Sequence, residues 1–466
     1  MKNSAPTFAF IGKPNNGKSS MISALTFDDR IEVSKEVGTT IKAKPYSYIH
    51  NNRVICNFYD TPGFEKAKAL WGYIRKNRDK TSYGNNLLRE FITKNRDEKS
   101  MQKDLEILNA ILESDFIVFV INISENYNQN VIGYELEIIR FIKKPILILF
   151  NKIGEKDYSQ EWRAKLHQYD LDIIQEFNPM NSSYENIQEI FKNLYRVDAT
   201  LQEKQHLDDI LQTHRVHLKE NRERSVKKIA QMIVEILQLE DSTIFKGDKV
   251  TAQDKAIALL KYREKIYAIE QKTKRDIEKI WGYHQVKVID NRAEIDSEEN
   301  IKLGLSKEKF IALGSVVGGA SGAVLGAPVA LVDFGLTALI SSGIGGIIGG
   351  SSAYLISNKF HSMIVSKNEI IHKIDKSNYN VTFILLKRSL EHLNRLIKHG
   401  HANRENIVIS QDNERLTFNA EWSFSKEEEQ NLAKIHTSIV KDEHTREKEK
   451  ELIFIIEGVI VKELFL

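Results

Sequence analysis

Gly12-Lys13-Pro14-Asn15-Asn16-Gly17-Lys18-Ser19 is the stretch of sequence that decides the fold. It has the pattern G-x-x-x-x-G-K-S of a phosphate-binding loop. The apolar, β-prone run 7–11 precedes it, and the run 20–25 that follows can start a helix. A strand, a loop and a helix in this order are the context in which the pattern binds phosphate. The competing interpretation, a chance glycine turn with a lysine, is disfavoured by that context.

The polar positions of this loop have physical roles if phosphate binds there. Backbone N–H groups point at the phosphate chain, and the following helix adds the positive end of its dipole. Lys18 can reach the β- and γ-phosphates, and the Ser19 hydroxyl can bind Mg²⁺. We therefore expect nucleotide contacts along the whole loop, from Asn15, Asn16, Gly17, Lys18, Ser19 and Ser20.

A second motif lies about 40 residues further on, after the predicted strand 53–59. It reads Asp60-Thr61-Pro62-Gly63, a D-x-x-G sequence. A carboxylate at this place can hold Mg²⁺ through water, and the glycine N–H can touch a γ-phosphate and release it after hydrolysis. The pattern is weak in isolation, but its order and spacing relative to the first loop make it specific.

Further predicted elements complete a doubly wound α/β sheet. Apolar strands at 116–121 and 145–150 alternate with amphipathic helices, which indicates a sheet covered on both faces. The second of these strands ends at Asn151-Lys152. Ligands of such sheets bind at the carboxyl ends of the strands, where all of these motifs fall. We expect this domain to occupy residues 1–197.

Composition and length set broader limits. The chain has 466 residues, 41% of them hydrophobic, and a formal net charge of +3. This length predicts two or three domains, and the near balance of charge does not indicate a polyanionic partner. The single cysteine, Cys56, excludes an intramolecular disulfide and favours a reducing compartment. Residues 1–4 lead directly into the first strand, so we expect no cleaved signal peptide and a cytoplasmic protein.

The motif order resembles translation-factor-related GTPases. Within that class the phosphate-binding loop, Gly38-Thr39-Thr40 and the sequence D-T-P-G-F are similar to the Era/TrmE branch of bacterial P-loop GTPases. The resemblance implies a GTP- and GDP-binding hydrolase that uses Mg²⁺. It implies Lys18, Thr40 and Gly63 as catalytic residues, and Ser19, Thr40 (or Thr39) and Asp60 as magnesium ligands. Asn15 matches the asparagine that helps some members hold K⁺.

The sequence departs from that branch at two positions. The base-reading motif N-K-x-D ends here in Gly154, so Asn151 and Lys152 are present but the carboxylate for guanine N1 and N2 is absent. Such a contact is worth roughly 1.5–3 kcal/mol per hydrogen bond. Phe64 follows the D-x-x-G motif where Ras-type enzymes have a water-orienting glutamine. We therefore expect slow hydrolysis, or hydrolysis that depends on a cation or a partner.

A closer resemblance covers more of the chain. Asp60–Phe64, the run N-x-I-G-E at 151–155, Glu161-Trp162-Arg163 and Gln168-Tyr169 resemble a little-characterised bacterial GTPase family with a C-terminal domain of unknown function. The insert from Glu65 to about Leu105 is basic, with aromatic residues interleaved. A solvated helical excursion is the favoured interpretation of that insert, and a partner or nucleic-acid surface that moves with the nucleotide state is the alternative.

Residues 198–466 predict a mainly α-helical domain, with helices near 198–240, 252–283 and 362–398. Within it, 310–332 and 334–358 carry no charge, and glycines recur every fourth residue from Gly314 to Gly326. Each uncharged run is long enough to span a bilayer, and small residues at this spacing let helices pack closely. We expect a glycine-rich apolar hairpin at 310–358 that inserts in or docks on a membrane. A buried hairpin in a soluble bundle is the alternative.

These observations leave three hypotheses for function. The first is a GTP-hydrolysing molecular switch of low turnover whose helical domain associates with the inner membrane, peripherally or integrally, or forms a homo-oligomer. The second is an RNA- or ribosome-associated Era-like GTPase, although no RNA-binding signature indicates a nucleic-acid partner. The third is a nucleotide-regulated membrane or scaffold protein that does not hydrolyse GTP.

Overall fold

A computed structural model of the chain describes residues 5–31, 43–78, 85–127, 129–197, 199–290, 361–409 and 424–464. The chain divides into two compact units. Unit 1 contains residues 1–218, 282–285 and 397–405, and unit 2 contains residues 219–281, 286–396 and 406–466. The predicted magnesium ligand Thr40, its neighbour Thr39 and the predicted hairpin 310–358 lie outside the described residues.

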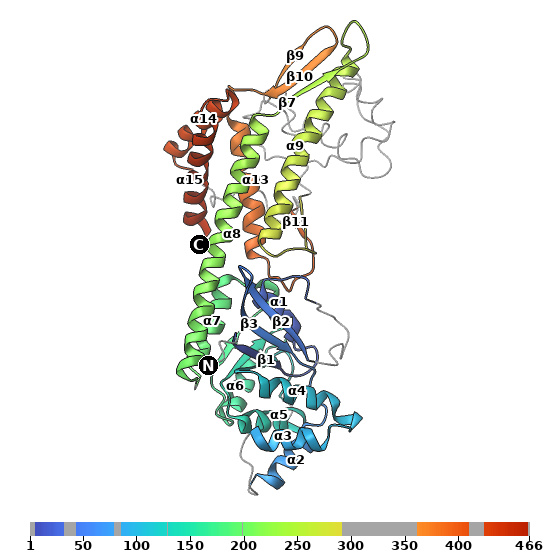
Figure 1. Ribbon diagram of the computed structural model, residues 1–466, viewed down its shortest axis with the longest axis vertical. Coiled ribbons are helices and arrows are strands. Elements are labelled where there is room, and N and C mark those ends of the chain that lie inside the picture. Colours follow the sequence, from blue (N-terminus) through green and yellow to red (C-terminus); the bar gives the residue numbers. More distant parts are fainter. Residues whose placement is uncertain are drawn as a thin grey trace. The chain divides into compact units, whose positions relative to one another are not determined.

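Unit 1 is built on a six-stranded sheet with the order β2-β3-β1-β4-β5-β6 (Figure 1). β2 pairs antiparallel with β3, and every other neighbouring pair is parallel. This confirms the doubly wound α/β fold that the apolar strands predicted. The strands are β1 (Thr7–Ile11), β2 (Lys44–His50), β3 (Arg53–Asp60), β4 (Phe116–Asn122), β5 (Ile146–Asn151) and β6 (Ile174–Glu176).

Alternation along β1 divides the apolar core between the two faces of the sheet. Phe8 packs against Phe58, Phe116 and, edge-on, Phe191 of α7 (Tyr184–Leu194). Ala9 and Ile11 lie in the core cluster of the other face, because successive side chains of a strand point to opposite faces. α1 (Lys18–Thr26) follows the phosphate-binding loop, as the sequence predicted.

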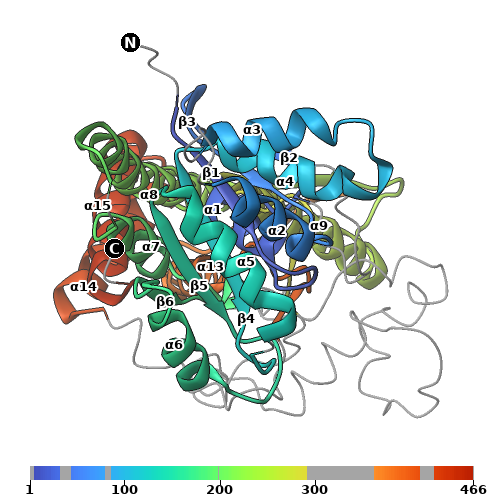
Figure 2. The same cartoon turned by 90° about the horizontal axis from the view of Figure 1, so that it is seen from below.

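The basic insert is helical, as the favoured interpretation predicted, but it is not a solvated excursion, because its apolar faces pack into the core. It forms α2 (Ala67–Asn77), α3 (Asn85–Lys94), the 3₁₀ turn η1 (Lys99–Met101) and α4 (Gln102–Glu113). Each helix is amphipathic, and their apolar faces join the core of the sheet through Leu70, Ile74, Leu87, Leu88, Phe91 and Leu105. Together with α5 (Gln129–Ile142) these helices lie on the side of the sheet away from α7 (Figure 2).

The remaining elements of unit 1 are mainly helical. They are α6 (Ser159–His167), the 3₁₀ turn η2 (Pro179–Asn181) and the first half of α8 (Leu201–Leu237). The single long helix predicted near 198–240 is therefore confirmed. Leu207 and Ile210 of this helix are fully buried, whereas Val216 is 41% exposed.

Unit 2 is largely helical, as predicted. It contains the second half of α8, α9 (Ala252–Ile280), α13 (Asn380–Lys398), α14 (Lys426–Val440) and α15 (Thr445–Leu464). Its described strands are β7 (Glu240–Ile244), β8 (Val288–Asp290), β9 (His361–Val365), β10 (Glu369–Ile374) and β11 (Ile407–Ile409). They form a three-stranded sheet, β7-β10-β9, and the pair β11-β8.

The predicted helix 362–398 was wrong in its first part. β9 and β10 occupy 361–374 as an antiparallel hairpin, and α13 begins only at Asn380. The short run Ser362–Val365 is too brief for its periodicity to distinguish a strand from a helix. This segment forms a strand because it pairs with β10, whose Ile370 and Ile374 are buried.

Two features are absent from the described residues. No group of three or more histidine, cysteine, aspartate or glutamate side chains there could hold a metal ion. Within the same described ranges, no helix combines the length and the apolar character needed to cross a bilayer. His214, His217 and His401 pack around the ring of Phe27.

Candidate functional site

The phosphate-binding loop joins β1 to α1 in a backbone conformation that its sequence requires. Gly12 has φ +135°, and a Cβ there would lie 2.4 Å from the Val120 carbonyl oxygen. Gly17 has φ +91°, and a Cβ there would lie 2.3 Å from Asn151 Nδ2. Gly17 is also the N-cap residue of α1, and no side chain caps this helix end. The first N–H groups of α1 are therefore arranged to meet an anion.

Two asparagines tie the loop to neighbouring strands. Asn16 Nδ2 donates to the Val120 carbonyl of β4 at 2.7 Å, and Asn151 Nδ2 donates to the Asn16 carbonyl at 2.9 Å. Both side chains are buried. The predicted nucleotide residue Asn151 thus supports the loop from the end of β5. Asn15 is exposed with φ +64°, and Ser20 lies in the first turn of α1.

Lys18 is folded back onto the loop that carries it. Its Nζ donates to the Gly12 and Lys13 carbonyls, each at 2.9 Å. Burial lowers the pKa of Lys18 to about 8, although the nearby Asp60 and Glu135 carboxyls act in the opposite direction. A cation held in this way, with little water around it, interacts strongly with a phosphate anion.

Ser19 and Asp60 come from the two separate motifs and meet at the site. Ser19 Oγ donates to Asp60 Oδ2 at 2.6 Å, and Asp60 is only 2% exposed. β1 and β3 are parallel neighbours with Phe10 opposite Asp60, so both motifs end at the same edge of the sheet. Gly63 then packs on the loop, since a Cβ there would lie 2.4 Å from Pro14 Cδ.

The predicted base-binding loop follows β5. Gly154 N donates to Ser124 Oγ at 2.8 Å, and Lys152 Nζ lies 3.2 Å from Asp157 Oδ2. Asp157 also accepts from Ser159 N at 3.0 Å, so this carboxylate is engaged at the start of α6. A Cβ on Gly154 would lie 3.2 Å from Ser124 Cβ. Ser124 thus stands beside the position where the related motif has a carboxylate.

Two buried carboxyl groups near the loop were missed by sequence reasoning. Glu135 of α5 is 2% exposed, and burial raises its pKa to about 8, although Lys13 and Lys18 act in the opposite direction. Asp104 of α4 is fully buried, and its Oδ1 accepts from the backbone N–H groups of Glu65 at 3.2 Å and Lys66 at 2.9 Å. Asp104 therefore fixes the chain that follows Gly63. No local pattern marks either residue, because both stand in amphipathic helices.

The arrangement can bind a phosphate chain and a hard cation at one place. It brings together Asn16, Gly17, Lys18, Ser19, Asp60, Gly63 and Asn151. Lys152 lies in the loop after β5, while the predicted ligand Thr40 lies outside the described residues. Phe64 packs against the apolar core of the insert side of the sheet. An apolar side chain in that position cannot orient water by a hydrogen bond.

Comparisons with known proteins agree with this geometry. Residues 7–152 match the family described as 50S ribosome-binding GTPase, and residues 163–455 match the family described as a domain of unknown function (DUF3482). GTPase Der of Mycoplasma capricolum is 29% identical over 155 residues, which cover 33% of this chain and 29% of that protein. GTPase Der of Chlamydia abortus is 32% identical over 147 residues, which cover 31% of this chain and 25% of that protein.

The chain thus spans less than a third of the length of these relatives. Among solved structures, one is that of Era in complex with MgGDPNP and nucleotides of 16S ribosomal RNA. Its alignment covers 60% of this chain and 89% of the Era chain, at 16% identity and a TM-score of 0.27. At that score the likeness carries no further argument. The second family match, in contrast, spans more than half of the chain. The chain belongs to the DUF3482 family, and its residues 7–152 form a P-loop GTPase domain that is similar to part of GTPase Der.

Proposed function

We propose that this protein is a molecular switch that binds GTP and hydrolyses its γ-phosphate. The observation that carries the proposal is the contact of Ser19 Oγ with Asp60 Oδ2 at 2.6 Å. It joins the phosphate-binding loop to the D-x-x-G segment, next to the buried Lys18. A loop that bound phosphate for structural reasons alone would have no need of a buried carboxylate at this position.

The same pair fits a magnesium ion. A serine hydroxyl and a carboxylate are the hard oxygen ligands that Mg²⁺ prefers, and both are held at the rim of the phosphate-binding loop. Ser19 and Asp60 would hold the ion, directly or through water, with Thr40 as the third expected ligand. When bound, Mg²⁺ supplies positive charge to the β- and γ-phosphate oxygens.

The protein's own residues supply the remaining chemistry. Lys18 Nζ exchanges its two loop carbonyls for phosphate oxygens and stabilises the charge that develops as water attacks. Gly63 lies against Pro14 of the loop, so its N–H would contact the γ-phosphate, and Asp104 anchors the residues after it. Since Phe64 cannot orient the attacking water, turnover is slow, or depends on K⁺ near Asn15 or on a partner.

Hydrolysis of GTP under single-turnover conditions tests this proposal. The full chain is compared with Asp60→Ala and with Asp170→Ala, which removes an exposed carboxylate paired with Arg140 elsewhere in the unit. We expect phosphate release to require Mg²⁺, to be faster in KCl than in NaCl, and to fall about 100-fold in Asp60→Ala only. Equal release by the two variants would refute the role of Asp60.

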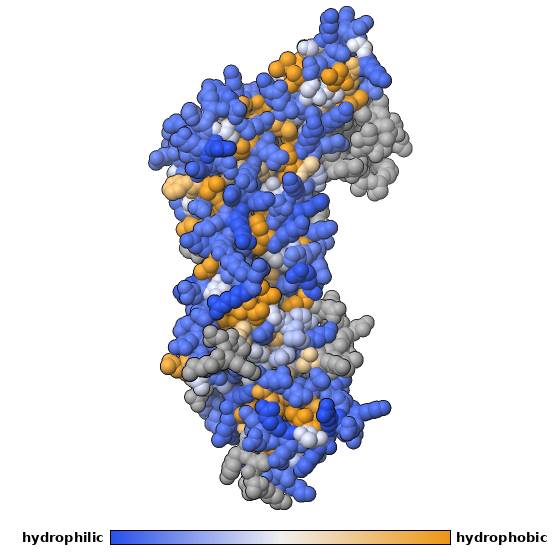
Figure 3. Space-filling view, viewed as in Figure 1, coloured by the Kyte–Doolittle hydropathy of each residue, from blue (hydrophilic) through white to orange (hydrophobic). Residues whose placement is uncertain are grey.

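A second proposed property is attachment to a lipid bilayer. Apolar side chains are exposed at one end of unit 2, on the edge strands β7 and β9: Ile244 is 71% exposed, and Met363, Ile364 and Val365 are each at least 43% exposed (Figure 3). β9 begins at His361, after Lys359 and Phe360, which follow the uncharged run 334–358. Lys246, Lys249 and Lys367 lie in the adjoining turns, where anionic lipid would attract them.

Vesicle sedimentation tests the attachment. We expect the chain to sediment with vesicles of phosphatidylethanolamine and phosphatidylglycerol, and Ile364→Glu to reduce the bound fraction. Phe454→Glu serves as the matched control, because Phe454 is 78% exposed on α15. Loss of binding in both variants, or in neither, argues against a docking role for this end of unit 2.

A further inference from the structure

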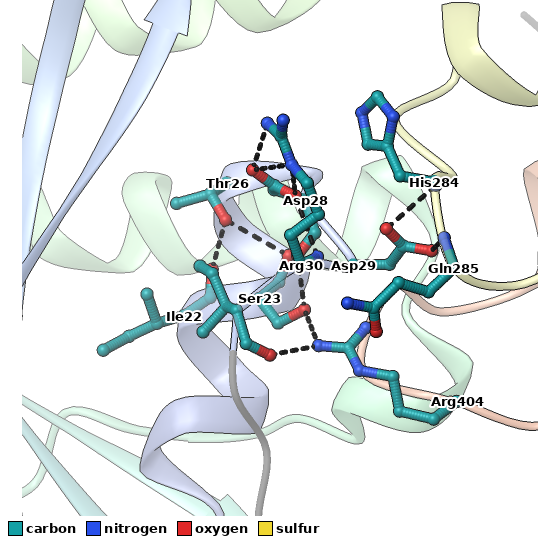
Figure 4. Close-up of polar contacts among 10 residues, drawn as sticks. Ile22, Ser23, Thr26, Asp28, Asp29, Arg30, His284, Gln285 and Arg404 are labelled. Carbon is teal, nitrogen blue, oxygen red and sulfur yellow. Dashed lines mark hydrogen bonds and ion pairs between the residues drawn. The ribbon is translucent and has the colours of Figure 1, made fainter.

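Two segments far from the phosphate-binding loop in sequence belong to the same compact unit as that loop. Residues 282–285 follow α9, and residues 397–405 contain the end of α13 and the turn after it. Both lie against the C-terminal end of α1 and the residues that follow it, 27–31 (Figure 4). They therefore connect this end of α1, through the chain itself, to α9 and α13.

Asp29 binds the first segment, residues 282–285. Its side chain is fully buried, and its two carboxylate oxygens accept the backbone N–H groups of His284 at 2.9 Å and Gln285 at 2.7 Å. Hydrogen bonds to a carboxylate are stronger than those between neutral groups, and two of them on one carboxylate also fix the orientation of the two donors. Residues 284 and 285 are thus held to the turn after α1.

Arg404 attaches the second segment, residues 397–405, to α1 and the residues after it. Its Nη2 donates to the Ile31 carbonyl at 2.6 Å and to Ser23 Oγ at 3.1 Å, and its Nη1 donates to the His401 carbonyl. The Ser23 hydroxyl is fully buried and also lies within hydrogen-bond distance of the His401 carbonyl, at 3.0 Å. One guanidinium therefore joins the last turn of α1, residue 31 and the turn after α13 (Figure 4).

Close packing leaves these contacts little freedom. Gly282 has φ +80°, and a Cβ there would lie 2.0 Å from the Phe27 carbonyl oxygen. The rings of Tyr283 and His401 stack with centroids 4.2 Å apart. Gly400 N donates to the Met180 carbonyl at 3.3 Å, in the loop after β6. The second segment thus also touches a loop at the carboxyl edge of the sheet, where ligands of such sheets bind.

α1 connects this docking surface to the phosphates. It is nine residues long, with Lys18 and Ser19 in its first turn and Ser23 and Thr26 in its last. Coupling between two sites is carried by rigid secondary elements and hydrogen-bond networks, and α1 is such an element between the phosphates and these contacts. We propose that Asp29 and Arg404 are positioning residues that couple the nucleotide state of the GTPase domain to residues 282–285 and 397–405.

The proposal rests on the GTP-binding function above. Because coupling is reciprocal, contacts that favour nucleotide binding are in turn stabilised by bound nucleotide. Losing Arg404 therefore speeds the release of GDP. Bound GTP analogue slows the exchange of the His284 and Gln285 amide hydrogens, whose acceptor is Asp29.

The test compares Arg404→Ala with Arg30→Ala in the full chain. Arg30 is exposed in the turn after α1, next to Asp29, and its side chain pairs only with Asp28 among the described residues, at 2.8 Å. It is therefore the matched control. We expect dissociation of a fluorescent GDP to accelerate at least fivefold in Arg404→Ala, within the range of roughly 5- to 150-fold found for coupled sites. The control should stay within about twofold of wild type, well below that range.

Hydrogen exchange of the wild-type chain provides the second measurement and does not depend on a variant that folds. We expect slower exchange at residues 284 and 285 with a non-hydrolysable GTP analogue than without nucleotide. Exchange that is the same in both states, or GDP release by Arg404→Ala that equals that of Arg30→Ala, overturns the coupling. A wild-type chain that binds no guanine nucleotide overturns the proposed function instead, so the two failures are distinguishable.

Discussion

The buried carboxyl group of Glu135 should make the stability of the nucleotide-free protein depend on pH. Its pKa is about 8 in the folded chain and 4.5 ordinarily, with burial as the largest cause. The folded state therefore keeps a proton that the unfolded chain has released, and the stability from this group is lost as pH rises from 4.5 through 8. One pKa unit corresponds to about 1.4 kcal/mol, so the loss between about pH 6 and about pH 8 is about 2 kcal/mol.

Glu135→Gln removes that titration while keeping the shape of the side chain. We expect the free energy of unfolding of wild type to fall by about 2 kcal/mol relative to this variant over that pH range. This free energy is measured by urea unfolding at several pH values, with proteolytic cleavage within the GTPase domain as the signal for unfolding. Glu137→Gln, on the same helix but partly exposed, is the control. A difference between wild type and Glu135→Gln that stays constant with pH would refute the reasoning.

Two further predictions follow from single positions. Gly282→Ala should lower the free energy of unfolding by roughly 2–5 kcal/mol, because the left-handed backbone and the contact with the Phe27 carbonyl both oppose a Cβ. Gly72→Ala, in the interior of α2 where a Cβ meets open space, should raise the free energy of unfolding by about 0.5–1 kcal/mol. Urea unfolding of the two variants measures both changes. Gly154→Asp supplies an acceptor for the 2-amino group of guanine, so competition binding should show GTP favoured over ITP by about 1.5–3 kcal/mol more than in wild type. An unchanged GTP/ITP ratio would show that position 154 does not face the base.

The sequence was sufficient to predict the parts of the site whose chemistry is local. The loop Gly12–Ser19 fixes its own conformation through glycines, and Asp60 falls at the end of a strand whose apolar pattern is unambiguous. Parallel neighbours then bring Ser19 and Asp60 to the same edge. For these residues a pattern, a spacing and a topology rule are enough.

Other features depend on tertiary contacts that no pattern contains. Glu135 and Asp104 are polar residues of amphipathic helices, and they are buried in the folded unit. Asp29 and Arg404 lie at opposite ends of the sequence, in turns without a motif. The hairpin β9–β10 was missed because runs of five or six residues have no decisive period.

Phosphate release from GTP by the full chain and by Lys18→Ala tests the central claim most directly. We expect slow release by wild type in the presence of Mg²⁺ and K⁺, and a loss of about 100-fold in the variant, because Lys18 is the buried cation of the phosphate-binding loop. Equal release from both proteins would contradict it. Tight binding of GTP by wild type with no release, even with K⁺ and lipid present, would instead identify a nucleotide-regulated protein that does not hydrolyse GTP.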